Sequence, residues 1–89
     1  AYRQTCLDQF PKDLEAGRRA ADAGDAPALR RVAHNLESVL ALLGEAQAAQ
    51  QARATEELAA VGALEPMRKG WQQVCSILQG LLAASEQRR

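Results

Sequence analysis

The most reactive side chains in the sequence are one histidine, His34, and two cysteines, Cys6 and Cys75. The cysteines lie far apart and neither belongs to a C-x-x-C pair, so their spacing predicts no metal site. Both fall on apolar helical faces, and we interpret them as reduced residues of the core. The imidazole of His34 is therefore the group whose chemistry has to be explained.

His34 is predicted to point into solvent from the middle of a helix. Apolar residues recur at helical spacing between residues 26 and 43 and define one buried stripe: Leu29, Val32, Ala33, Leu36, Leu40 and Leu43. At about 100° per residue, His34 lies about 150° from the centre of that stripe. An exposed imidazole on a rigid helix is accessible to a partner.

The residues one helical turn from His34 favour a particular use of its imidazole. They are Arg30 and Arg31 before it and Glu37 and Ser38 after it, with Ala41 one further turn along the same face. Guanidinium groups can neutralise the oxygens of a phosphoryl group carried by the imidazole. The small Ser38 and Ala41 leave room for a partner's surface, and the Ser38 hydroxyl can donate a hydrogen bond. The same pattern also fits an ordinary surface histidine among solvated charges.

The elements that must position His34 are helices. Proline and glycine divide the chain into a short opening segment, residues 2–10 before Pro11, and four longer segments, about 11–23, 26–43, 45–61 and 66–86. Each long segment has an apolar stripe, with Met67, Trp71 and Leu78 on the fourth and Leu58 and Val61 anchoring the end of the third. These patterns predict an all-α, antiparallel four-helix bundle with a short extra N-terminal helix, formed by residues 1–89 as a single domain.

Composition excludes several classes of function. The chain has 89 residues, of which 47% are hydrophobic and 25% charged, and its formal net charge is zero. A general nucleic-acid binder would carry a basic excess. No apolar run approaches the roughly 20 residues that span a bilayer, so we expect no direct membrane contact. A bundle of this size also has little room for a deep enzyme pocket.

Residues 25–44, DAPALRRVAHNLESVLALLG, resemble the central segment of histidine-containing phosphotransfer (HPt) domains. The family pattern is L-x-x-x-A-H-x-L with a glycine ten residues after the histidine; Leu29, Ala33, His34, Leu36 and Gly44 occupy those positions here. The arrangement of helices extends the resemblance to nearly the whole chain. Two positions depart from the pattern, because members typically carry lysine and glycine where this chain has Glu37 and Ser38.

The resemblance implies a phosphoryl carrier of a two-component phosphorelay. His34 would accept phosphate from a receiver-domain aspartate and pass it to the aspartate of a response regulator, supported by Arg30, Arg31 and Ser38. Glu37, Ala41 and Leu42 would belong to the docking surface. Such a domain binds no ATP and needs no cofactor of its own, since Mg²⁺ is expected on the receiver. It would be cytoplasmic, as the C-terminal domain of a bacterial hybrid sensor histidine kinase whose parent chain can be anchored in the inner membrane.

Three other functions remain open at this point. The first is a degenerate HPt-like docking module that binds a receiver or another protein without phosphotransfer, because an acidic Glu37 would repel phosphoryl oxygens. The second is the dimerisation and phosphoacceptor region of a histidine kinase, in which an acidic residue and later a proline normally follow the histidine. Asn35 and the proline-free stretch after it argue against this function. The third is a purely structural helical bundle.

Overall fold

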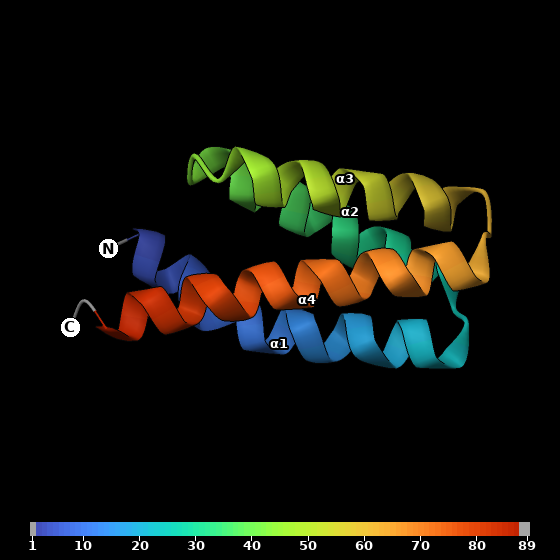
Figure 1. Ribbon diagram of the computed structural model, residues 1–89, viewed down its shortest axis with the longest axis horizontal. Coiled ribbons are helices and arrows are strands. Elements are labelled where there is room, and N and C mark those ends of the chain that lie inside the picture. Colours follow the sequence, from blue (N-terminus) through green and yellow to red (C-terminus); the bar gives the residue numbers. More distant parts are fainter. Residues whose placement is uncertain (1, 88–89) are drawn as a thin grey trace.

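The chain folds into four helices joined by short turns. The computed structural model describes the backbone of residues 2–87 and the side chains of residue 5 and residues 8–84. The helices are α1 (Tyr2–Ala23), α2 (Ala26–Leu42), α3 (Ala46–Ala60) and α4 (Leu64–Gln87). Successive helices run in opposite directions, and each contacts its two neighbours around a bundle of 39 × 20 × 17 Å (Figure 1). The predicted all-α, antiparallel four-helix bundle is confirmed, and residues 2–87 contain no strand.

Glycine ends each of the first three helices. Gly24, Gly44 and Gly62 have φ values of 68°, 78° and 71°, a left-handed conformation that costs other residues energy. In the connection between α1 and α2, the Asp25 carboxylate accepts a hydrogen bond of 3.2 Å from the Ala28 amide and so caps the start of α2. These predicted turn signals hold α2 in the register that places His34 at its middle.

The start of α1 differs from the prediction. We expected a short separate helix over residues 2–10, but α1 passes through Pro11 without interruption. Proline removes one hydrogen bond of the helix and bends it, and Figure 1 shows the dark-blue start of α1 inclined to the remainder. Burial of Phe10 against the core gives this turn a packing partner that offsets the lost bond.

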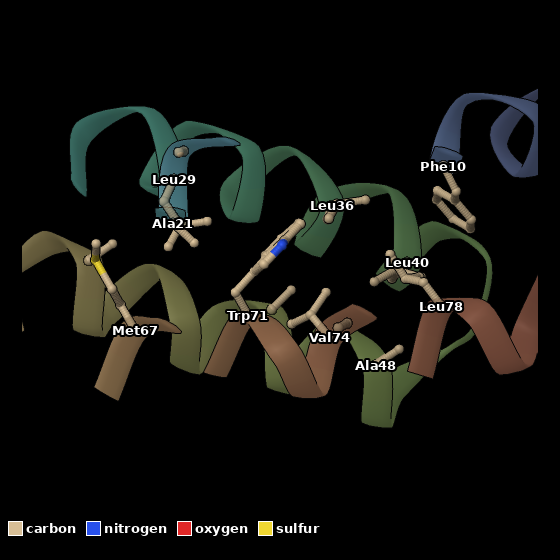
Figure 2. Close-up of a cluster of buried hydrophobic side chains, with 14 residues drawn as sticks. Phe10, Ala21, Leu29, Leu36, Leu40, Ala48, Met67, Trp71, Val74 and Leu78 are labelled. Atoms are coloured by element: carbon tan, nitrogen blue, oxygen red, sulfur yellow. The ribbon is translucent and has the colours of Figure 1, made fainter. Parts of the chain in front are cut away.

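The core lies along the bundle axis, where side chains from all four helices meet (Figure 2). The predicted core residues Met67, Trp71, Leu78, Leu36 and Leu40 are all buried. At its edge, Cys75 is half-buried with a free thiol, and burial raises the pKa of that thiol. The side chain of Cys6 lies outside the described residues.

Helix α3 contributes mainly small residues to the interior. Its buried residues are Ala48, Ala49, Ala52, Thr55 and Ala59. Leu58 packs partly against the core, but the prediction that Val61 does the same is wrong, since Val61 is 77% exposed. The helix ends at Ala60, and Val61 as its C-cap turns away from the stripe. Small side chains allow α3 to approach its neighbours closely.

None of the helices, as far as the chain is described, is long and apolar enough to cross a membrane.

Two glycines within helices provide a matched test of the packing between α1 and α4. A Cβ at Gly17 would overlap the ring of Trp71, whereas a Cβ at Gly80 would have no neighbouring atom within 4 Å. We expect Gly17→Ala to lower the free energy of unfolding by about 1–3 kcal/mol because the ring must move. Gly80→Ala should raise it by about 0.5–1 kcal/mol through helix propensity alone. Urea denaturation measures both; stabilisation by Gly17→Ala would contradict the packing described.

Candidate functional site

His34 lies at the middle of α2 with its side chain 63% exposed. The adjacent Ala33 and the nearby Leu36 are buried on the opposite side of the helix. Two consecutive turns of buried side chains therefore hold the backbone of His34 while its ring stays accessible. The exposure predicted from the helical wheel is confirmed.

Glu56 of α3 is the direct partner of the imidazole. His34 Nδ1 lies 2.9 Å from Glu56 Oε2, across the α2–α3 interface. The Glu56 side chain is only 19% exposed, so neighbouring groups restrict its position. A carboxylate accepts the proton of Nδ1–H, and this tautomer leaves the lone pair of Nε2 free. The contact therefore orients the ring and selects which nitrogen can act as a nucleophile.

Beside His34 the surface is hollowed, with a volume of about 420 Å³. The residues lining this hollow are Pro27, Arg30, Arg31, His34, Asn35 and Glu56. The structure thus brings both predicted arginines to the imidazole. The hollow is large enough for a phosphoryl group, and each guanidinium offers several donors for its oxygens.

Glu37 occupies the position one turn after His34 and is partly buried. Desolvation raises the pKa of its carboxyl group, and the neighbouring Glu56 raises it further through hydrogen bonding and charge repulsion. Arg53 of α3 and His34 act in the opposite direction and lower this pKa. The site therefore combines two carboxyl groups whose mutual repulsion is only partly offset by nearby cations.

The remaining predicted site residues are distributed over the same face. Ser38 Oγ donates a hydrogen bond of 3.3 Å to the carbonyl oxygen of His34, so its hydroxyl proton is directed to the backbone. Ala41 is exposed and lines a second hollow together with Glu37 and Arg53. Leu42 is 72% exposed but lines neither hollow.

Sequence reasoning missed the two residues that α3 contributes, Glu56 and Arg53. A signal for both exists in the turn between the helices. If the chain folds back symmetrically about Glu45, each residue before it pairs with the one equally far after it. His34 and Glu56 are each eleven residues from Glu45, and Glu37 and Arg53 are each eight residues from it. Applied to an antiparallel helix pair with a short turn, this rule identifies the facing residues.

Three groups of the site could also hold a metal ion. One donor atom each from His34, Glu37 and Glu56 lie within 4.8 Å of one another. The expectation that the chain has no metal site considered only the spacing of histidine and cysteine. It did not consider carboxylates that a second helix brings to His34.

The chain matches the Hpt domain family over residues 1–88, and it therefore belongs to that family. Hpt domains take part in phosphotransfer in two-component signalling and interact there with receiver domains and response regulators. No curated protein and no solved structure showed a significant match to the chain.

The crowding of carboxyl groups predicts how Glu37 titrates. We expect its pKa to fall in a Glu56→Gln variant, which removes the repelling charge, and to rise in an Arg53→Gln variant, which removes an attracting one. Side-chain carbon NMR measures both. Because folding raises this pKa, the stabilisation that protonated Glu37 provides is lost as the pH rises through it. Glu37→Gln should thus be more stable than the parent at pH 7 and lose that advantage in acid.

Equal Glu37 titration in the parent and both variants would show that the three side chains do not interact. Glu65→Gln is the control for loss of a carboxylate, because Glu65 pairs with Arg68 on α4.

Proposed function

We propose that this Hpt domain carries a phosphoryl group on Nε2 of His34. The observation that supports this most directly is the 2.9 Å contact between His34 Nδ1 and Glu56 Oε2 on an otherwise exposed ring. A nucleophilic imidazole must present an unprotonated nitrogen, and it gains from a carboxylate that holds the other nitrogen's proton. Glu56 is therefore the positioning residue of this proposal.

The transfer step is a direct displacement. The lone pair of Nε2 attacks the phosphorus of the receiver's aspartyl phosphate, the N–P bond forms, and the P–O bond to the aspartate breaks. The aspartate leaves as a carboxylate and no proton moves. The ring gains a positive charge, since Nδ1 keeps its hydrogen, and the Glu56 carboxylate stabilises that charge. The reverse reaction with the aspartate of a response regulator returns the ring to its neutral form.

Arg30 and Arg31 are proposed to bind the phosphoryl oxygens, because they line the same hollow as His34. Ser38 is proposed to help mainly through its small size, which keeps the approach to His34 open. Its hydroxyl would have to leave the His34 carbonyl to reach a phosphoryl oxygen. Glu37, Ala41 and Leu42 are proposed to contact the docked receiver.

The partner implied by this chemistry is a receiver domain, which brings the phosphorylated aspartate and its Mg²⁺. We propose a hybrid sensor kinase as the source of the phosphoryl group and a response regulator as its acceptor. Such a relay operates in the cytoplasm, so we also propose that location for this domain. The carrier itself would have no ATP-dependent activity.

A second candidate function is supported by Glu37. A carboxylate in the position where the family typically has lysine disfavours a phosphoryl group on the neighbouring imidazole. The chain would then be a docking module that binds a receiver without accepting its phosphate. The two functions share a surface but differ in whether His34 becomes phosphorylated.

Phosphotransfer from a radiolabelled receiver separates these functions. We expect the parent to acquire acid-labile label and His34→Gln to acquire none, with its helical circular dichroism unchanged because an exposed side chain contributes little packing. NMR of the phosphorylated protein should place the phosphate on Nε2. Phosphate on Nδ1 would contradict the role of Glu56, and receiver binding without label would support the docking module instead.

Reversing the charge at position 37 tests the electrostatics of the site. Glu37→Lys should raise the fraction of phosphorylated domain at equilibrium with a receiver by about two- to fivefold, since a repulsive pair at the surface becomes attractive. Added salt should reduce this difference.

Glu65→Lys is the matched control, because Glu65 is an exposed acid of α4 that pairs with Arg68 and not with a residue of the site. An equal increase in both variants would reflect overall charge and receiver docking. No change in Glu37→Lys at low salt would show that Glu37 lies too far from the phosphoryl group to affect it.

A further inference from the structure

The donor groups around His34 suggest a ligand other than phosphate. His34 and Glu37 lie one turn apart on α2, and Glu56 reaches them from α3. Their donor atoms lie within 4.8 Å of one another, and Nδ1 of His34 is 2.9 Å from Oε2 of Glu56. In a tetrahedral zinc site with bonds of about 2.0–2.2 Å, neighbouring donors are about 3.3–3.6 Å apart. Small rotations of the carboxylates would therefore bring all three into a coordination shell.

We infer that His34, Glu37 and Glu56 form a site for a divalent transition-metal ion such as Zn²⁺. Imidazole nitrogens and carboxylate oxygens are both ligands of zinc, and a site with three protein ligands leaves the fourth tetrahedral position to water. Mg²⁺ and Ca²⁺ prefer shells made of oxygen alone, so they fit this set less well.

The two helices supply the site with a stable frame. Ala33 and Leu36 fix the α2 side of the site through the core, and Thr55, directly before Glu56, is fully buried on α3. The ligands are thus attached to backbone that is already ordered, and only side-chain rotations remain to be fixed on binding. A bound cation would also stabilise the adjacent carboxylates of Glu37 and Glu56 more than water does, because its attraction to both outweighs their mutual repulsion.

The arginines around the site oppose a cation and limit its affinity. Arg30 and Arg31 share the hollow with His34, and Arg53 lines a second hollow together with Glu37. The Arg53 guanidinium, however, also pairs with Glu57 at 3.3 Å, which provides a place for it away from the metal. The geometry therefore predicts that removal of Arg53 strengthens metal binding.

The site has a consequence that rests on the proposed phosphoryl transfer. A metal on Nδ1 would take the place of the proton that Glu56 holds, and it would withdraw electron density from the ring. Nε2 would then be a weaker nucleophile. Zinc binding to His34 would therefore inhibit phosphoryl transfer to the same imidazole.

Titration calorimetry with zinc chloride tests the site without any receiver, so its result does not depend on the proposed phosphotransfer. We expect one zinc ion per chain in the parent. Affinity should fall by about tenfold or more in His34→Gln, Glu37→Gln and Glu56→Gln, and it should rise in Arg53→Gln. Glu65→Gln is the matched control and should bind like the parent.

Cobalt substitution identifies the ligands independently. The cobalt-loaded parent should show visible bands of a tetrahedral ion without the intense thiolate charge-transfer band that Cys6 or Cys75 would add. The inference would be overturned by the absence of zinc binding at millimolar concentration, by unchanged affinity in His34→Gln, or by a thiolate band. Failed phosphotransfer together with intact zinc binding would contradict the proposed function alone.

Discussion

The close approach of α3 to α2 determines the chemistry of this domain. The buried residues of helix α3 are alanines and Thr55, so its backbone can lie near its neighbours. This approach allows the Glu56 side chain to reach Nδ1 of His34 at 2.9 Å. Without it, His34 would be one more exposed histidine on a helix, with neither nitrogen selected. The least conspicuous helix of the bundle is thus the one that organises the site.

Two carboxyl groups, those of Glu37 and Glu56, lie close together at the same α2–α3 interface. Glu56 disfavours the ionised form of Glu37, while Arg53 offsets part of that effect. In the proposed phosphoryl transfer Glu56 holds a proton and stabilises a charged ring. Glu37 has no such use in phosphoryl transfer, because it faces a group that would become more negative. With Glu37 present, the net charge of the site depends on the arginines and on the ligand that binds.

Sequence patterns predicted the bundle because each α-helix has a local cause: an apolar stripe, a glycine after it, or a cap such as Asp25. They failed where packing overrides the local signal. Pro11 was expected to end a helix, but burial of Phe10 carries α1 through it. Val61 fits an apolar stripe only if α3 extends past Ala60. The exposure of His34 was predictable from one helix, whereas its partner Glu56 depends on how two helices pair, which periodicity does not contain.

The pairing of α2 and α3 also underlies both ligands that we propose for this site, a phosphoryl group and a metal ion. A carboxylate that holds the proton of an imidazole occupies the position of a carboxylate that would share a metal with it. A phosphoryl group adds negative charge at Nε2, which Arg30 and Arg31 would stabilise. A metal ion adds positive charge at Nδ1, which Glu37 and Glu56 would stabilise. Each ligand therefore uses the charges that oppose the other. On this basis the balance between acidic and basic side chains, rather than the fold, decides which state of His34 prevails.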